Sequence, residues 1–283
     1  MIVVLGKNGQ LAKEFRKIYK GKAIYLSSQD IDLTRLEEII PALNELSPDI
    51  LVNFTAYNNV DLAEKDSNNF LINSLAIKEI ASYSHSKDIP LIHISTDYVF
   101  DGTKGSYTEY DTPNPINKYG KAKLDGENYI QNICNKYFII RTSWLYSCFG
   151  ENFLTKVIAM YKSKSDLMGA YDLIGSPTSA KSLAHAIKHL IELNKENNRD
   201  FGIFHFSNQG SISKYTFVKK IVSSLNLEMD SEEILIKKVK NSEFHLAAQR
   251  PYNTTLVSNK FSEKFNYEIP CWEDELKSII GEI

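Results

Sequence analysis

Short apolar runs alternate with longer amphipathic stretches over the first 145 residues of the chain. The runs are rich in β-branched and aromatic residues and are bounded by turn or polar residues. Buried parallel strands have this composition, and amphipathic stretches between them are typical of helices that cover a parallel sheet. The pattern therefore predicts an α/β fold. The predicted strands are Ile2 to Leu5, Ala23 to Leu26, Ile50 to Phe54, Leu91 to Ser95 and Tyr137 to Arg141.

The alternation loosens after about residue 150, which predicts a second, smaller lobe of mixed α/β structure. We therefore divide the chain into residues 1–150 and residues 151–283, and allow it to cross back between the two lobes. The polar run from Asn194 to Asp200 has nothing apolar to bury and is predicted to be a solvated loop. The predicted elements of this half are helices at Phe153 to Tyr161, Ser182 to Leu193, Lys214 to Leu225 and Trp272 to Ile280, and a strand at Ile203 to Ser207.

A helix start is predicted near Thr34, because Thr34 followed by Glu37 has the pattern of a capping box. Pro41 then falls inside the apolar pattern of that helix. Proline lacks a backbone N–H and its ring clashes with the preceding turn. We therefore expect Pro41 to kink or end the helix.

Composition narrows the class of protein and of partner. The chain has 283 residues, 43% of them hydrophobic and 24% charged, which is enough to bury a core and excludes a disordered chain. A formal charge of -2 offers no electrostatic footprint for nucleic acid or an anionic membrane, so a small-molecule partner is expected. The apolar N-terminal run is too short for a signal peptide, and no run reaches the 18 or so apolar residues of a membrane span. A soluble, cytoplasmic protein is expected.

No metal site is predicted from the cysteines and histidines. Cys134, Cys148 and Cys271 are far apart and lack Cys-x-x-Cys spacing, so they are expected to be reduced thiols. His185 and His189 have the spacing of a zinc pair, but no glutamate follows His185 and no third ligand is apparent. A solvated helix face is the favoured interpretation of that pair.

A glycine-containing turn directly follows the first predicted strand and opens an apolar-periodic stretch. Gly6 would permit a tight turn, and Gly9 would let backbone N–H groups approach a pyrophosphate at the helix N-terminus. Ala12 stands where a third glycine is common. An ordinary strand–turn–helix junction is the alternative, and the position at the N-terminal strand favours a dinucleotide site. Its other expected cofactor contacts are Asn8, Gln10 and Leu11.

The end of the second strand bears on the choice of cofactor. An acidic residue there hydrogen-bonds the ribose of NAD and would repel the extra phosphate of NADP. Here Ser27 and Ser28 follow the strand, and no carboxylate occurs until Asp30. NADPH is therefore favoured, by no more than about 1–3 kcal/mol in kcat/KM, and NADH is allowed. Asp32, followed by Leu33, is expected either to reach the adenine edge or to serve as a polar residue at a helix entry.

Tyr119 and Lys123 lie one helical turn apart and would share one helix face. This spacing alone proves little, because Tyr83 with Lys87 and Tyr215 with Lys219 repeat it. Context separates the first pair: it lies between the fourth and fifth predicted strands, after the Ser-Thr-Asp sequence that contains Thr96. Ligands bind at the carboxyl ends of strands in open α/β sheets.

These three residues suit the reduction of a carbonyl group. A free tyrosine has a pKa near 10, so proton transfer near neutral pH calls for a pKa lower by about 3 units. An adjacent ammonium in a partly desolvated cleft can supply that shift, and we expect Lys123 to do so for Tyr119. Thr96 would hydrogen-bond the reacting oxygen, and Lys123 would also hold the nicotinamide ribose. Each residue alone would be read as a structural one.

The sequence resembles the extended short-chain dehydrogenase/reductases and, within them, the dTDP-4-dehydrorhamnose reductases. The resemblance spans nearly the whole chain, and its most specific part is Ser-Thr-Asp-Tyr-Val-Phe-Asp-Gly at 95–102. The other matching stretches are 6–11, 30–34, 52–64, 119–127, 141–146, Asn152-Phe153, 175–178 and 250–254.

This resemblance implies a Rossmann-type, doubly wound parallel sheet over residues 1–150 and a sugar-nucleotide substrate lobe over residues 151–283. It implies reduction of the C4 ketone of a nucleotide-linked 6-deoxy-4-keto sugar by NADPH or NADH. Thr96, Tyr119 and Lys123 become the catalytic residues, and Thr55, Ala56 and Tyr57 lie beside the cofactor. The residues expected to face the sugar nucleotide are Val60, Thr96, Tyr98, Trp144, Asn152 and Arg250.

One departure from the family pattern leaves alternatives open. The family commonly has Asp-Gln before its Gly-x-Pro-Thr sequence, whereas here Leu173 follows Asp172. Another nucleotide-sugar ketoreductase is therefore an alternative, and so is a non-catalytic dinucleotide-binding regulatory subunit, although the intact catalytic set argues against the latter. Some family members dimerise around a metal ion. A homodimer is thus one expected assembly, without an identifiable metal-ligand set.

Overall fold

The computed structural model describes residues 1–195, 200–226 and 235–283 of the chain. Its centre is a six-stranded sheet in the order β11-β6-β4-β3-β1-β2, with every neighbouring pair parallel. This is the doubly wound α/β fold that the sequence predicted. The strands are β1 (Ile2–Leu5), β2 (Ala23–Leu26), β3 (Ile50–Asn53), β4 (Leu91–Thr96), β6 (Tyr137–Thr142) and β11 (Gly202–His205).

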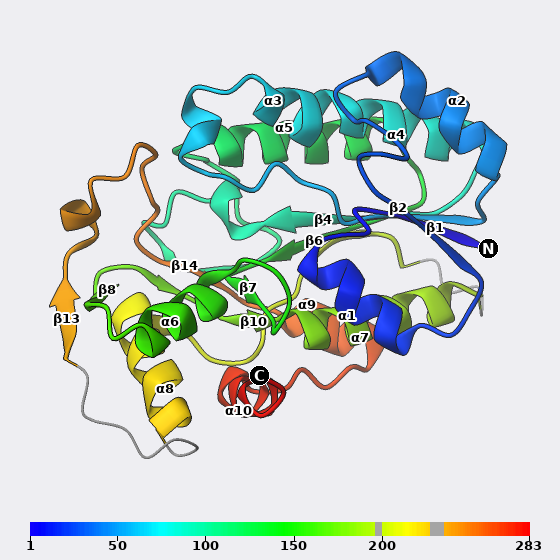
Figure 1. Ribbon diagram of the computed structural model, residues 1–283. Coiled ribbons are helices and arrows are strands. Elements are labelled where there is room, and N and C mark those ends of the chain that lie inside the picture. Colours follow the sequence, from blue (N-terminus) through cyan, green and yellow to red (C-terminus); the bar gives the residue numbers. More distant parts are fainter. Residues whose placement is uncertain (196–199, 227–234) are drawn as a thin grey trace.

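Helices cover both faces of this sheet (Figure 1). Alternate residues of a strand point to opposite faces, so Val4 packs with Phe15 of one helix layer while Val3 packs with Ile80 of the other. Burial of both faces explains why the strands are continuously apolar. One layer comprises α1 (Gln10–Ile18), α7 (Ala180–Lys195) and α9 (Asn259–Phe265), and the other comprises α2 (Leu36–Leu46), α4 (Ala76–Ser86) and α5 (Lys118–Ile133).

A second lobe lies beside the carboxyl ends of the strands and is built from short strand pairs and helices (Figure 1). Its core is aromatic, with Phe217 in ring contact with Tyr146, Phe153 and Trp272. The helices are α6 (Phe153–Lys162), α8 (Lys214–Asn226) and α10 (Trp272–Ile280). The strand pairs are β5 (Gly105–Tyr107) with β14 (Thr254–Leu256), β7 (Leu145–Tyr146) with β10 (Thr178–Ser179), β8 (Leu167–Ala170) with β13 (Ile236–Val239), and β9 (Ile174–Gly175) with β12 (Ile212–Ser213).

The start of α2 differs from the predicted capping box. The N-cap is Arg35, which makes no side-chain cap bond, and Thr34 instead donates from its N and Oγ1 to Asp32. Of the two effects expected of Pro41, a kink or the end of the helix, the second does not occur, because α2 continues to Leu46. Pro41 lies on the exposed face, where water can hydrate the carbonyl that lacks its helical partner.

The chain crosses back between the two lobes. The strand predicted at Ile203 to Ser207 was assigned to the smaller lobe, but β11 pairs in parallel with β6 at the edge of the central sheet. α7 likewise packs on that sheet beside α1. Asn194 and Lys195 of the predicted polar loop belong to α7, residues 196–199 lie outside the described residues, and Asp200 belongs to no helix or strand. None of the described helices is long and apolar enough to cross a bilayer.

Candidate active site

The turn after β1 is shaped by Gly6. Its φ is +94°, and a Cβ at this position would lie 3.0 Å from the carbonyl carbon of Phe54 and from the N atom of Thr55. The turn ends at Gly9, the N-cap of α1, which makes no side-chain cap bond. The first N–H groups of α1 are therefore free to bind an anion such as a pyrophosphate. Gly6 also lets this turn pack directly against the backbone that follows β3.

A cavity opens from this turn along the ends of β1, β2 and β3. It is lined by Ser27, Ser28 and Asp32, with apolar walls from Ile31 and Leu33. Apolar walls with a polar rim suit an adenosine. The other predicted cofactor residues on this cavity are Gly6, Asn8, Gly9, Thr55 and Ala56.

Asp30 places a negative charge at the end of β2, where only the hydroxyl groups of Ser27 and Ser28 were expected. Its Oδ2 accepts hydrogen bonds from the Ser27 N at 2.8 Å and from the Ser27 Oγ at 2.7 Å. These bonds hold the pKa of Asp30 below its usual value. A carboxylate therefore stands directly beside Ser27, although sequence order placed it three residues away, and the Ser27 hydroxyl proton is already donated to it.

A second cavity continues from the first, because Gly9, Phe54, Thr55, Ala56 and Asn58 line both. It brings together the three predicted catalytic residues Thr96, Tyr119 and Lys123, which come from the end of β4 and the first turns of α5. Gln10 and Leu11, expected at the cofactor, and Trp144 and Asn152, expected at the sugar nucleotide, also line it. The two cavities form one cleft along the carboxyl edge of the sheet.

α5 can present Tyr119 because it begins very close to β4. Asn117 caps the helix by accepting a hydrogen bond from the Gly120 N at 2.8 Å. A Cβ on Gly120 would lie 2.1 Å from the Tyr98 carbonyl oxygen, so only glycine allows this approach. The ring of Tyr119 then packs edge-on against Tyr98, with ring centroids 5.9 Å apart.

The prediction that Lys123 lowers the pKa of Tyr119 is wrong for this structure. Burial raises the pKa of Tyr119 to about 12, and a hydrogen bond with Thr96 opposes that rise only in part. Lys123 points elsewhere: its Nζ donates to the Ile94 carbonyl at 2.7 Å and lies 3.2 Å from His93 Nε2. Burial lowers the pKa of Lys123 to about 8. Tyr119 is therefore a protonated phenol at neutral pH.

Asp97 and Lys214 are charged groups of the site that sequence reasoning missed. Burial raises the pKa of Asp97 to about 6, although Thr254, Ser143 and Thr96 all donate hydrogen bonds to it. The Lys214 Nζ lies 3.5 Å from the Trp144 ring centroid and 4.1 Å from that of Phe153. Burial lowers the pKa of Lys214 to about 7, and Asp97 opposes that shift. The only indication in the sequence that Asp97 belongs to the site was its charge and its place in the Ser-Thr-Asp sequence.

Some predicted substrate and cofactor residues lie outside the cleft lining. Arg250 binds Asp61 through a 2.6 Å bond from Nη2 to Oδ2 and donates to the Ala248 carbonyl. Tyr57 donates from its hydroxyl to Asp66. Neither residue lines the two cavities, nor do Val60 and Tyr98.

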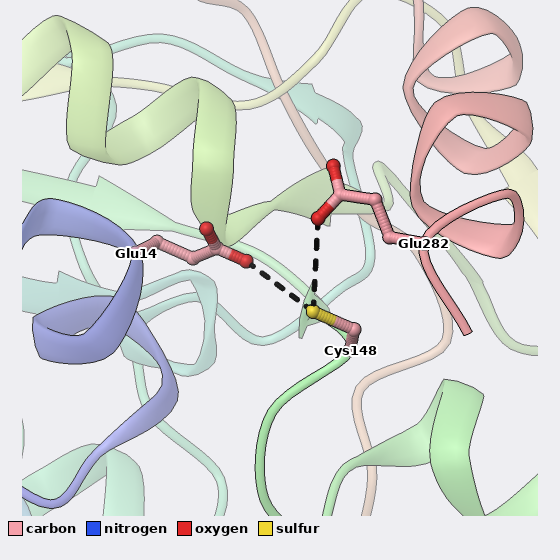
Figure 2. A group of neighbouring side chains, drawn as sticks. All are labelled: Glu14, Cys148 and Glu282. Atoms are coloured by element: carbon pink, nitrogen blue, oxygen red, sulfur yellow. Dashed lines mark hydrogen bonds between the residues drawn. The ribbon is translucent and has the colours of Figure 1, made fainter. Parts of the chain in front are cut away.

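Glu14, Cys148 and Glu282 form the one group among the described residues with metal-ligand chemistry (Figure 2). The ligand atoms lie within 4.8 Å of one another. Lys17, however, lies 3.3 Å from Glu14 and 3.4 Å from Glu282, so a cation already balances both carboxylates. Burial also raises the pKa of the Cys148 thiol, which keeps it protonated. We assign no metal here, and none to His189, whose ring contacts the Phe265 carbonyl at 2.9 Å.

Known proteins resemble this chain over its full length. The dTDP-4-dehydrorhamnose reductase of Sinorhizobium fredii is 31% identical over 99% of this chain and 96% of its own. The spore coat polysaccharide biosynthesis protein SpsK of Bacillus subtilis is 32% identical over 99% and 97%. The crystal structure of dTDP-4-dehydrorhamnose reductase from Bacillus anthracis in complex with NADP superimposes with a TM-score of 0.92 at 33% identity, covering 100% of this chain and 99% of that one. The RmlD substrate binding domain model matches residues 1–283, and the chain belongs to this family.

Proposed function

We propose that the protein is an NADPH-dependent reductase of the C4 ketone in a nucleotide-linked 6-deoxy-4-keto sugar, namely dTDP-4-dehydrorhamnose. One observation carries the proposal: Thr96, Tyr119 and Lys123 meet in a cleft that continues directly into the glycine turn after β1. The names of the relatives agree with this activity.

The protonated state of Tyr119 suits a reduction. A ketone that accepts a hydride at carbon develops negative charge on oxygen and needs a proton there. Tyr119 holds such a proton at neutral pH, and Thr96, which bonds with it, can orient the same oxygen. Tyr119 would act as the general acid, and Thr96 as a hydrogen-bond donor to the carbonyl. The Tyr119 phenolate formed by this step is then reprotonated from solvent.

The residues of the first cavity fit a dinucleotide. Gly6 allows the tight turn after β1, and the N-terminus of α1 beside that turn has no side-chain cap, so its first N–H groups can bind an anion. Gly9, which lines both cavities, and Gln10 and Leu11 of the second cavity would hold the pyrophosphate, and Ser27, Asp32 and Leu33 of the first would hold the adenosine. The nicotinamide, when bound, supplies the hydride. Of the two cofactors, the relative in complex with NADP supports NADPH.

The substrate side of the cleft offers an aromatic wall and a cation. Trp144 and Asn152 line the cleft next to the catalytic residues. Lys214 does not line the two cavities, but its Nζ lies 3.5 Å from the Trp144 ring centroid, and the charge of Asp97 favours its protonated form. A nucleotide sugar carries a diphosphate, and its negative charge near Lys214 would likewise favour the ammonium form of this lysine. Leu173 keeps another nucleotide-sugar ketoreductase as the second candidate, and a homodimer remains one expected assembly.

The decisive experiment adds dTDP-4-dehydrorhamnose to the purified protein with NADPH and follows the loss of the reduced nicotinamide. We expect oxidation of NADPH that depends on the sugar. A panel of keto sugars on other nucleotides separates the two ketoreductase candidates. NADPH binding without oxidation by any of these sugars would instead support a regulatory subunit.

A further inference from the structure

A buried series of hydrogen-bonded residues connects the wall of the cofactor cleft to Lys123. Asn53, at the end of β3, and His93, in the middle of β4, are both 0% exposed. The Thr55 N donates to Asn53 Oδ1 at 2.9 Å, Asn53 Nδ2 lies 3.1 Å from His93 Nδ1, and His93 Nε2 lies 3.2 Å from Lys123 Nζ. Four residues from the end of β3, the segment that follows it, the middle of β4 and α5 are thereby linked in series.

The hydrogen bond from Thr55 to Asn53 fixes which group donates and which accepts in every later hydrogen bond of the series. The backbone N–H of Thr55 can only donate, so the Asn53 side chain must turn its oxygen towards it. The Asn53 amide nitrogen then faces His93, and this nitrogen can also only donate. His93 Nδ1 must therefore be the ring nitrogen without a hydrogen.

The last link then decides the state of Lys123. A neutral imidazole without a hydrogen on Nδ1 carries it on Nε2, which faces Lys123 Nζ. An ammonium has no lone pair to accept that hydrogen, whereas a neutral amine has one. A neutral amine also keeps a hydrogen for the bond to the Ile94 carbonyl at 2.7 Å.

We propose that Asn53 and His93 are positioning residues that hold Lys123 as a neutral amine in mildly alkaline solution, so that dinucleotide binding draws one proton onto Lys123. The proton comes from solvent and forms an N–H bond on Nζ. Once protonated, Nζ can no longer accept from His93, and its additional hydrogen can be donated to the oxygen of a ribose hydroxyl, which can accept it. This inference rests on the proposed function for the identity of the ligand.

The charged groups around Lys123 allow the neutral state. Lys123 is 1% exposed, and its burial lowers its pKa to about 8, while Glu127 on the next turn of α5 opposes that shift. The Glu127 carboxylate, however, already binds Arg141 of β6 and Ser95 of β4. Burial and Lys123 together keep the pKa of His93 well below its usual value, so the imidazole is neutral. Asp97 and Tyr119 share the cleft with Lys123 and have raised pKa values.

The first test reads the tautomer of His93 in the protein without ligand. Nitrogen-15 labelling of histidine and two-bond proton–nitrogen correlation at pH 9 distinguish the two ring nitrogens, with His93 assigned from a His93→Gln variant. We expect the hydrogen on Nε2. A hydrogen on Nδ1 overturns the proposal, and this result does not depend on any cofactor or activity.

The second test uses one isosteric substitution to reverse the donor and acceptor roles along this series of hydrogen bonds. In Asn53→Asp, one carboxylate oxygen accepts from Thr55 and the other from His93 Nδ1–H, which leaves Nε2 to accept from a Lys123 ammonium. We expect calorimetric titration with NADP+ at pH 9, in buffers of different ionisation enthalpy, to show uptake of close to one proton by the wild type and almost none by N53D. The matched control is Asn208→Asp, a buried asparagine that also accepts a backbone N–H, from Ser179 at 2.7 Å, and should behave as wild type.

The outcomes separate this inference from the proposed function. Binding of NADP+ to the wild type without proton uptake overturns the inference and leaves the function intact. Failure of NADP+ to bind overturns the function, while the tautomer of His93 still decides the inference. If N53D does not fold, the wild-type tautomer and proton count remain sufficient.

Discussion

Arg141 and Glu127 form a fully buried ion pair between β6 and α5. Arg141 Nη2 lies 2.6 Å from Glu127 Oε2, Arg141 Nε contacts both carboxylate oxygens at 3.0 and 3.1 Å, and the two side chains are 2% and 0% exposed. This bidentate contact fixes the helix that carries Tyr119 and Lys123 to the sheet beneath it.

Removal of one charge from this pair should destabilise the fold strongly. In Glu127→Gln, Arg141 would be left as an uncompensated buried cation, which costs about 3–5 kcal/mol in the free energy of unfolding. Urea denaturation measures this. Asp166→Asn breaks the exposed Lys237–Asp166 pair and should cost less than about 1 kcal/mol. Equal losses in the two variants would contradict a structural role for the buried pair.

Substitution of Tyr119 by phenylalanine should abolish most turnover but not cofactor binding. The ring stays packed against Tyr98, while the proton donor is lost, so kcat should fall by roughly 10²- to 10⁴-fold. Steady-state kinetics and NADPH titration check both parts. Tyr215→Phe changes the tyrosine of another Tyr-x-x-x-Lys pair and should leave kcat unchanged. Undiminished turnover in the Tyr119 variant would remove it from the mechanism.

Asp97 should make stability fall as pH rises from about 4 to 6. Its pKa is about 6 in the folded chain against an ordinary value of 3.8, so the folded state holds the extra proton in this window. Ionisation of the buried carboxyl then lowers the free energy of unfolding by about 3 kcal/mol. Asp97→Asn should lack this loss, since Thr254 and Ser143 can turn their hydroxyls to suit an amide.

Urea denaturation of wild type and D97N at several pH values tests this sign. The stability of D97N relative to wild type should rise by about 3 kcal/mol across the window and stay constant above it. A constant difference at all pH values would show that Asp97 titrates normally in the folded protein.

Asp30→Asn should increase the preference for NADPH over NADH. The Asp30 carboxylate lies beside Ser27, where it would oppose a nearby 2′-phosphate. Loss of its charge should raise the ratio of kcat/KM values for NADPH and NADH by roughly threefold to tenfold, and high salt should reduce the effect. Asp49→Asn, which removes an exposed carboxylate elsewhere, should leave the ratio unchanged. An unchanged ratio in D30N would place Asp30 away from the phosphate.

The strands of the sheet were predictable because local composition decides them. Ile2–Leu5 and Ala23–Leu26 have the predicted bounds, and β3, β4 and β6 each differ from prediction by one residue. The sixth strand, β11, begins one residue and ends two residues before the predicted bounds. The meeting of Thr96 with Tyr119 and Lys123 also followed from the sequence, because strand ends and the adjoining helices share one edge of the sheet.

Partners distant in sequence were not predictable. His93 is a single polar residue in an apolar strand, and nothing local shows that Asn53 and Lys123 lie on either side of it. The high pKa of Tyr119 was missed for the same reason, since Lys123 turns towards Ile94 and His93. In the sequence Asp30 is separated from Ser27, whereas in the structure a turn brings its carboxylate back to hydrogen-bond with Ser27.

The position of β11 at the edge of the sheet affects folding during synthesis and the choice of truncated fragments. Ribosomal synthesis completes β1 to β6 long before residues 202–205 emerge, so the edge of β6 stays open while the intervening residues are translated. Open strand edges pair with other chains and aggregate. A fragment that stops at residue 150 would retain that edge and lose the cover of α7, and should precipitate when expressed alone. A smaller version of this enzyme must therefore keep the segment from α7 to β11, whatever else is removed from the second lobe.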